Sequence, residues 1–354
     1  MTKKESIHLT LYPQKGILKI NNPGRSILIS AVGAGGYELR FALSYKSSFL
    51  LFKENSGTLA ALLVLCLILS ILVPSKFLTY LNFRTILRSI STTAIVAFGM
   101  TFVIITGGID LSVGSVIALS GTLCAGLISS GFGYVIAVIA GLAIGTLCGV
   151  IDGFIVSRTP IPPFIVTMSM MNIARGASYI YSSGKPIRTP DAFGNFGNGF
   201  VMGVPVPVIV MLIILIIMSL LLSKSRFGRY VYAIGGNLEA AKFSGIKTQQ
   251  IIWLVYILIS FLASIAGIIT ASRLYSGQPT VAQGFEMDVI AATVLGGTSM
   301  SGGVGRIGGT MIGAIIIGVL GTGMNLLKIP SFYQMIVMGL VVLAAVFIDV
   351  IRKK

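Results

Sequence analysis

The chain has 354 residues, of which 55% are hydrophobic and only 10% are charged. A soluble domain carries about 25% charged residues, and a single hydrophobic core stops growing at roughly 250–300 residues. The composition therefore excludes a soluble globular protein. The formal net charge of +16 does not indicate nucleic-acid binding, because the basic residues flank apolar runs instead of forming one stripe. We predict an all-α, polytopic integral membrane protein with membrane lipid as its main solvent.

Cysteine and histidine usage excludes several kinds of site. Cys66, Cys124 and Cys148 all fall inside apolar runs, which suits packing and provides no metal-ligand spacing or disulfide framework. The single histidine, His8, lies in the polar N-terminal region, so a histidine-based metal site or catalytic triad is not available. We expect no metal and no cofactor in this chain.

Residues 1–48 form an extension that is polar and basic at its start. Its apolar part, "ILISAVGAGGYELRFALSY", is too short and interrupted to span a membrane, and the extension lacks the design of a cleaved signal peptide. We expect it to be disordered or weakly ordered. Residues 49–354 are expected to form a single transmembrane domain.

Apolar runs of about 20 residues predict membrane-spanning helices. The run at 288–300 is too short to cross as a regular helix. Ten crossings place both termini on one side, and segments on that side hold 18 of the 26 Lys and Arg residues. The positive-inside rule therefore predicts that both termini are cytoplasmic. The ten predicted spans are 57–73, 85–106, 112–129, 132–156, 161–182, 203–222, 251–271, 288–300, 308–326 and 332–350.

The segment "ITGGIDLSVG" places a carboxylate between two spans, where an ionised acid needs a use or a shelter. Gly107 and Gly108 end a helix easily, and Asp110 or Ser112 can then cap the next helix at its positive end. Asp110 can alternatively face a water-filled path and touch substrate, or contact another subunit. All three interpretations stay open from the residues alone.

Small residues four apart predict close helix packing, since they share one helix face and let another backbone approach. One set lies in the fourth span, and a second set is Gly305, Gly309 and Gly313. Asp152 lies near the inner membrane surface, where snorkelling or a backbone partner can satisfy it, and we interpret it as structural. The first set is Gly141, Gly145, Gly149 and Gly153.

Two short motifs are weak matches to nucleotide-binding patterns. "GVGRIG" (303–308) has G-x-G-x-x-G spacing but no preceding strand and no βαβ unit, so a tight helix turn with Arg306 at the inner surface fits better. "SSGKPI" contains Gly-Lys, but a P-loop requires glycine at 179, which is tyrosine, and Ser or Thr at 186, which is proline. The chain is therefore expected to hydrolyse no nucleotide.

The polar segment 223–250 is the longest internal loop on the predicted cytoplasmic side. Asn237 is a good N-cap, Glu239 falls in the first turn, and Gly245 is placed as the terminating residue of a short helix of about two turns. A helix this short needs tertiary contacts to be stable. It either rests on the lipid surface or docks against another protein, and the small pair Ala240 and Ala241 favours docking.

Four stretches carry a resemblance to a known family. "ITGGIDLSVGSVIALSG", "SRFGRYVYAIGGNLEAAKFSGI", "GFEMDVIAATVLGGTSMSGGVGRIGGTMIGA" and "YQMIVMGLVVLAAVFID" closely resemble permease subunits of ribose-type ATP-binding-cassette (ABC) importers, a family with members for ribose, xylose, galactose, arabinose and autoinducer-2. The resemblance is collinear from about Lys53 to Asp349. The sequences "SGQPT…GFEMD" and "GGTSMSGG" resemble the ribose group of this family most.

The resemblance implies a transport subunit of the bacterial inner membrane that is not itself an enzyme. Its expected partners are a second permease copy in a homodimer, cytoplasmic ABC ATPase subunits that hold ATP and Mg, and a periplasmic or lipid-anchored sugar-binding protein. The segment Gly235–Ile246 matches the family's coupling helix, which contacts the ATPase. The ATPase-coupling residues are then Gly235, Gly236, Asn237, Leu238, Glu239, Ala240, Ala241, Phe243, Ser244 and Gly245.

An ion-coupled secondary sugar transporter is the alternative from another class. Such a protein usually needs acidic residues or ion sites near the membrane midplane. Asp110, Glu286 and Asp288 are the candidates, and we expect all three toward the membrane surfaces. Glu286 and Asp288 are expected at the outer end of the eighth span, where they either contact the binding protein or occupy a helix first turn. A membrane enzyme is a third class, which the single histidine disfavours.

Overall fold

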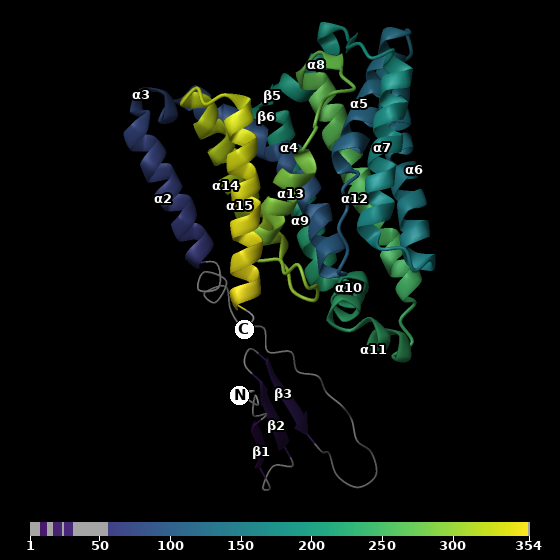
Figure 1. Cartoon of the computed structure of the whole chain (residues 1–354), viewed down its shortest axis with the longest axis vertical. Helices are drawn as coiled ribbons and strands as arrows, with labels where there is room; N and C mark the ends of the chain where they lie inside the picture. The colour runs from purple at the N-terminus through teal and green to yellow at the C-terminus, as the bar shows by residue number, and fades with distance from the viewer. Residues whose placement is uncertain (1–7, 13–16, 23–24, 31–55, 353–354) are drawn as a thin grey trace. The chain divides into compact units, whose positions relative to one another are not determined.

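The computed structural model describes residues 8–12, 17–22, 25–30 and 56–352 in two units, Met1–Ser56 and Gly57–Lys354 (Figure 1). The described part of the first unit is a three-stranded antiparallel sheet with its second strand in the middle. These strands were not predicted from the sequence, although Pro13 and the Pro23–Gly24 pair are turn signals between them. The other residues of the 1–48 extension lie outside the described residues. The strands are β1 (His8–Tyr12), β2 (Ile17–Asn22) and β3 (Arg25–Ser30).

The second unit is helical, and a helix covers each of the ten predicted apolar ranges. Among the described residues, α4, α6, α9, α12 and α14 are long and apolar enough to cross a membrane, while α2, α5 and α15 contain shorter apolar helices. The ten helices are α2 (Ser56–Leu72), α4 (Tyr80–Ile105), α5 (Val113–Ser129), α6 (Tyr134–Arg158), α7 (Pro163–Ser182), α9 (Val206–Lys224), α12 (Thr248–Arg273), α13 (Phe285–Leu295), α14 (Ile307–Leu326) and α15 (Ser331–Arg352).

Short elements occupy the two ends of the helical unit. In Figure 1, α3 and α8 lie at one end, and α10 and α11 lie at the other. Two short antiparallel strand pairs, β4 with β7 and β5 with β6, join the connections. These elements are α3 (Pro74–Phe77), β4 (Ile187–Arg188), α8 (Asp191–Asn198), β5 (Phe200–Val201), β6 (Val204–Pro205), α10 (Arg226–Gly236), α11 (Leu238–Phe243) and β7 (Ser276–Gly277).

The core forms around α4 and α12, which pack against each other and against several neighbouring helices. Every residue of α4 from Ile90 to Ile105 is buried, and α12 packs against α4, α5 and α6. The small residues of α6 let α12 approach closely, because a Cβ at Gly149 would lie 2.6 Å from the Ser260 Cβ. The Trp253 indole Nε1 donates a hydrogen bond to the Val150 carbonyl at 2.9 Å, which fixes the two helices together.

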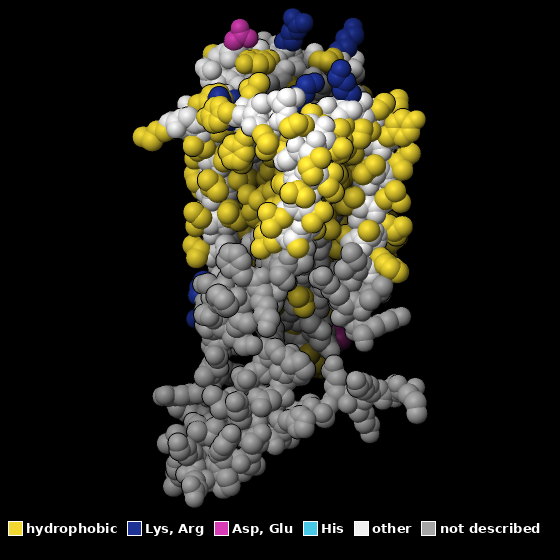
Figure 2. All heavy atoms as spheres, turned by 90° about the vertical axis from the view of Figure 1, so that its left-hand side faces the viewer, with side chains coloured by type: hydrophobic (Ala, Val, Ile, Leu, Met, Phe, Trp, Pro, Cys, Tyr) yellow, Lys and Arg dark blue, Asp and Glu magenta, His cyan; other side chains and the backbone are white. Residues whose placement is uncertain are grey.

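Large apolar side chains cover the outside of the helical unit. Leu63 on α2, Val135 on α6 and Leu343 on α15 are more than 60% exposed. Figure 2 shows hydrophobic side chains over the flank of the unit and Lys and Arg side chains at its upper end, where α3 and α8 lie. A soluble protein rarely exposes so extensive an apolar surface, so this flank is suited to contact with lipid or another membrane helix.

Candidate functional site

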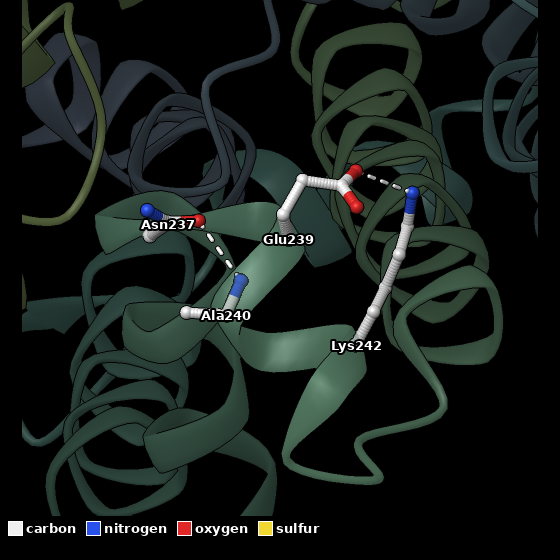
Figure 3. A network of polar contacts seen from close by, with 4 residues as sticks. All are labelled: Asn237, Glu239, Ala240 and Lys242. Carbon is white, nitrogen blue, oxygen red and sulfur yellow. Dashed lines mark hydrogen bonds and ion pairs between the residues drawn. The ribbon is translucent and has the colours of Figure 1, made fainter.

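The segment 223–250 folds into two consecutive helices that share one residue. Asn237 is the C-cap of α10, where its N–H donates to the Ala233 carbonyl at 3.1 Å, and it is also the N-cap of α11. Its side-chain Oδ1 accepts a hydrogen bond from the Ala240 N–H at 2.9 Å (Figure 3). The N-cap predicted from the sequence is therefore present, and it fixes the direction in which α11 leaves α10.

The C-terminal end of α11 is a Schellman motif. The Gly245 N–H donates to the Lys242 carbonyl at 2.9 Å, and the Ile246 N–H donates to the Ala241 carbonyl at 3.1 Å. Gly245 has φ +78°, a left-handed conformation that glycine adopts without strain. The terminating residue predicted from the sequence is thus present, and both ends of this six-residue helix are closed.

The two alanines of α11 differ in exposure. Ala241 is buried against the rest of the chain, whereas Ala240 is exposed. Because consecutive helical residues lie about 100° apart, only Ala240 of the pair is available to a docking partner. The outward surface instead combines Ala240 with Leu238, which is 39% exposed, and Phe243, which is 90% exposed.

One ion pair lies on the outward side of α11. The Lys242 Nζ and a Glu239 carboxylate oxygen are 2.8 Å apart, and both side chains are about half exposed or more (Figure 3). An exposed pair of this kind contributes only a few tenths of a kcal/mol, about 0.3–0.5, so it orients the two side chains more than it stabilises the helix. An exposed aromatic ring and a small methyl group beside an ion pair make α11 suited to a protein contact.

Asp110 and Ser112 lie in the connection between α4 and α5, and both are buried. The Asp110 Oδ1 accepts hydrogen bonds from the Ser112 N–H at 2.8 Å and from the Ser112 hydroxyl at 2.7 Å. Ser112 is the N-cap residue of α5 and makes no capping hydrogen bond of its own. The capping expected from the sequence is therefore absent, and Asp110 instead orders the turn that leads into α5.

A cluster of buried oxygen atoms without a hydrogen-bond partner lies between this turn and helices α6 and α12. Asp152 is fully buried, so it does not snorkel, and neither of its oxygens has the backbone partner that was the other expectation. It interacts electrostatically with Asp110. A Cβ at Gly108 would overlap the Tyr256 hydroxyl, which brings that group to the same turn. An unpartnered buried polar group costs about 1–3 kcal/mol, and such losses are typical of functional sites. The unpartnered atoms are Asp110 Oδ2, Asp152 Oδ1 and Oδ2, Tyr256 Oη and Ser260 Oγ.

Glu286 and Asp288 lie in the first turn of α13, which agrees with their expected place in a helix. Gly284 precedes the helix with φ +76°, and Gly297 with φ +86° follows its end. These glycines explain why α13 covers 285–295 instead of the predicted 288–300. The helix has only 11 residues, or about 16 Å at 1.5 Å per residue, so it cannot cross a bilayer alone.

The start of α13 lies deep inside the helical unit. A Cβ at Gly114, in the first turn of α5, would lie 2.8 Å from a Glu286 carboxylate oxygen. Two residues further along α5, the Val116 side chain lies beside Gly145 of α6, which faces Ser264 in the middle of α12. Glu286 is therefore close to the level of the middle of α12 and not toward the membrane surface, where the sequence analysis placed it. The reason is that the chain runs inward from the end of α12 before α13 begins, as Figure 1 shows.

Arg175 of α7 holds this inward-running segment, and the sequence analysis missed its role. The Arg175 Nη1 donates to the carbonyl oxygens of Pro279 and Val281, both at 2.7 Å. A non-helical segment inside a membrane protein leaves carbonyl groups that need donors, and arginine supplies five N–H groups. The signal that could have found it is the charge itself, because Arg175 falls well inside the predicted span 161–182, whereas Arg88 lies near the start of the span 85–106.

The predicted packing glycines face other backbones closely. A Cβ at Gly141 would lie 3.0 Å from the Ser120 carbonyl oxygen of α5, and one at Gly153 would lie 2.7 Å from the Trp253 carbonyl oxygen of α12. Gly145 and Gly149 have similarly close neighbours on α12. In the loop before α14, Arg306 is the N-cap residue, so "GVGRIG" is a helix entry and has no strand before it.

The family described as "Branched-chain amino acid transport system / permease component" matches residues 82–346. The ribose import permease protein RbsC of Bacillus subtilis is 49% identical over 304 residues, which cover 85% of this chain and 94% of that protein. RbsC of Escherichia coli is 48% identical over 297 residues, or 82% of this chain and 92% of that protein. The L-arabinose transport system permease protein AraH of Escherichia coli is 41% identical over 312 residues, which cover 87% of this chain and 95% of that protein. No solved structure matches the chain.

Proposed function

The chain belongs to this family of transport-system permease components and is a multi-pass inner-membrane protein. We propose that it is the membrane subunit of an ATP-driven ribose importer. The observation that carries the proposal is the identity of nearly half the residues with two ribose import permeases over more than four fifths of each chain. Identity to the arabinose permease is lower, at 41%. The substrate is therefore a monosaccharide, with ribose favoured over arabinose.

The proposed topology has ten membrane crossings with both termini in the cytoplasm. The excess of Lys and Arg in the segments on the side of the termini supports this orientation. It places α10 and α11 in the cytoplasm and α3 and α8 at the outer surface. Five of the ten helices have the length and composition of a crossing by themselves, and the others include the short α13, which would cross together with the non-helical segment before it.

An ABC ATPase is the proposed cytoplasmic partner, and α11 is the proposed contact. Its exposed face has an aromatic ring, Phe243, beside the small Ala240, a combination that suits insertion into a groove. ATP and Mg would be bound by that partner, whose hydrolysis supplies the energy. A second copy of this chain would complete the path through the membrane.

The outer surface is proposed to receive a sugar-binding protein with acidic groups. The Arg84 and Arg88 guanidinium groups lie 3.7 and 4.7 Å from the Phe200 ring centroid. Arg273 Nη1 donates to the Arg88 carbonyl at 3.3 Å, so three cations gather at one place and none of these contacts is with an acid. Complementary charge speeds and orients association, which favours an acidic partner surface.

The wall of the sugar path is proposed to include the segment that Arg175 holds and the first turn of α13. Arg175, Glu286 and Asp288 are all partly exposed although they lie deep in the helical unit. Charged groups at that depth face water or protein and not lipid, because exposure to lipid is costly. A neutral, hydroxyl-rich solute would meet hydrogen-bonding groups there, and the path would open alternately to each side of the membrane.

One observation favours an ion-coupled secondary transporter as the second candidate. Asp110 and Asp152 are buried near each other with three unpartnered carboxylate oxygens, an arrangement that can hold a proton.

Uptake of labelled ribose into proteoliposomes separates the two candidates. The proteoliposomes contain the chain with its ATPase and binding protein. Vanadate, which arrests ABC ATPases, should abolish uptake, and a protonophore should leave it unchanged. Uptake that resists vanadate and stops with the protonophore would replace the ABC assignment with proton coupling.

A further inference from the structure

Three backbone segments meet beside α11 without side chains between them. They are the end of α4 at Ile105, the end of α10 at Gly235, and the turn at Gly302 and Gly303 between α13 and α14. The Gly303 N–H donates to the Ile105 carbonyl at 2.9 Å. A Cβ at Gly235 would overlap the Ile105 carbonyl oxygen and would lie 2.6 Å from the Gly303 nitrogen. We call this contact of Ile105, Gly235, Gly302 and Gly303 the glycine junction.

The glycine junction requires glycine for two separate reasons. Gly302 and Gly303 have φ of +80° and +74°, which other residues adopt only with strain. A Cβ at Gly302 would also lie 3.0 Å from the carbonyl oxygens of both Ile105 and Gly235. Backbone therefore touches backbone, and no side chain can change rotamer to absorb a displacement. Such a contact moves as one piece.

Two side-chain contacts hold α10 to the same neighbours. Tyr232, one turn before Gly235, donates its hydroxyl to the Gly305 carbonyl at 2.7 Å. Phe227, near the start of α10, stacks on Phe102 of α4 with ring centroids 5.9 Å apart. These contacts fix α10 against α4 and against the turn that precedes α14, so rotation of α10 has to move both.

The connection from α11 to the glycine junction is short and stiff. Asn237 begins α11 through its hydrogen bond to the Ala240 N–H, and only Gly236 separates Asn237 from Gly235. We propose that the glycine junction transmits displacement of α11 to α4, α13 and α14, and so couples ATP hydrolysis to opening of the sugar path. The proposal rests on the proposed function, because it requires an ATPase that moves α11.

Two helical glycines provide a matched pair of variants. Gly235→Ala introduces a methyl group into the backbone contact. Gly308→Ala introduces the same group in the first turn of α14, where nothing lies within 4 Å of the added Cβ and φ is not positive. Both changes replace glycine by alanine within a helix, so a difference between them reports the junction. Tyr232→Phe is a third variant that adds no volume and removes only the hydroxyl that bonds Gly305.

The experiment uses the full chain reconstituted with its ATPase and binding protein. Permease abundance, ATPase co-purification, ATP hydrolysis and ribose uptake are measured for each variant. Gly235→Ala should bind the ATPase normally and lower uptake by about tenfold or more, as a misfit of one methyl in a close-packed contact does. Uptake per ATP hydrolysed should fall with it. Tyr232→Phe should lower the same ratio, and Gly308→Ala should match the wild type.

The ratio of uptake to ATP hydrolysis distinguishes transmission from simple packing. A purely structural role would lower abundance and both rates together and leave the ratio unchanged. If Gly235→Ala keeps the wild-type ratio, or fails to accumulate while Tyr232→Phe keeps that ratio, the proposal is overturned. If the wild-type complex itself shows no ATP-driven ribose uptake, the proposed function fails, and this result is distinguishable because it involves no variant.

Discussion

The substitution Ala240→Arg tests whether α11 contacts an ATPase. The Ala240 side chain is exposed, and its N–H, bonded to Asn237 Oδ1, is unaffected by a change of side chain. An exposed substitution outside special features changes stability by less than about 0.5 kcal/mol, and arginine is nearly as good a helix former as alanine. The variant should therefore fold and insert normally.

The expected loss lies in the contact with the partner. A bulky charged group would replace a methyl group beside Phe243, which is 90% exposed and is the largest apolar group that α11 presents. Overpacking a close contact costs about 1–3 kcal/mol, and each 1.4 kcal/mol lowers affinity about tenfold. Interface cores are also depleted of charge, so the upper part of this range is expected. Affinity for the ATPase should fall about tenfold to a hundredfold.

The assay compares ATPase co-purification and ribose uptake for Ala240→Arg and Ala240→Ser. Serine keeps a small neutral side chain at the same exposed position, so it should retain both properties. Normal abundance of Ala240→Arg with poor ATPase recovery and lost uptake is the expected result. Full ATPase binding together with wild-type uptake in the arginine variant would refute the reasoning and make α11 a helix that rests on the lipid surface.

Three further predictions concern the helical unit. Asp152→Asn should leave the melting temperature of the purified protein unchanged or raise it, because neither carboxylate oxygen has a hydrogen-bond partner; a drop of more than a few degrees would show an unseen partner. Gly149→Val should destabilise the contact of α6 with α12 by about 1–3 kcal/mol and lower abundance, whereas Gly176→Ala, with open space around its Cβ, should not; equal abundance of the two would contradict the packing. A cysteine at Gln278 in a cysteine-free background should react with a membrane-impermeant reagent from outside, and labelling only from the cytoplasm would reverse the proposed topology.

Local rules allowed much of the fold and part of the site to be read from the sequence. Hydrophobic run length located a helix at each of the ten apolar ranges, and five of these helices are long and apolar enough to cross a membrane. Cap chemistry located α11, because Asn237 and Gly245 act on backbone groups only a few residues away. The family resemblance rested on the same local stretches and agrees with the family match over 82–346.

The positions of charged groups were decided only by the tertiary structure. The sequence placed Glu286 near a membrane surface because its helix looked like the end of a span, but the chain first runs inward, held by Arg175. It placed Asp152 near the inner membrane surface, with snorkelling or a backbone partner to satisfy it, whereas the side chain is fully buried in a helix that packs on α12. Both outcomes depend on contacts between residues more than 100 positions apart along the chain or on helices far apart in sequence, and no local pattern contains them. The glycine junction has the same origin, since Ile105, Gly235 and Gly303 become neighbours only when three helix ends meet.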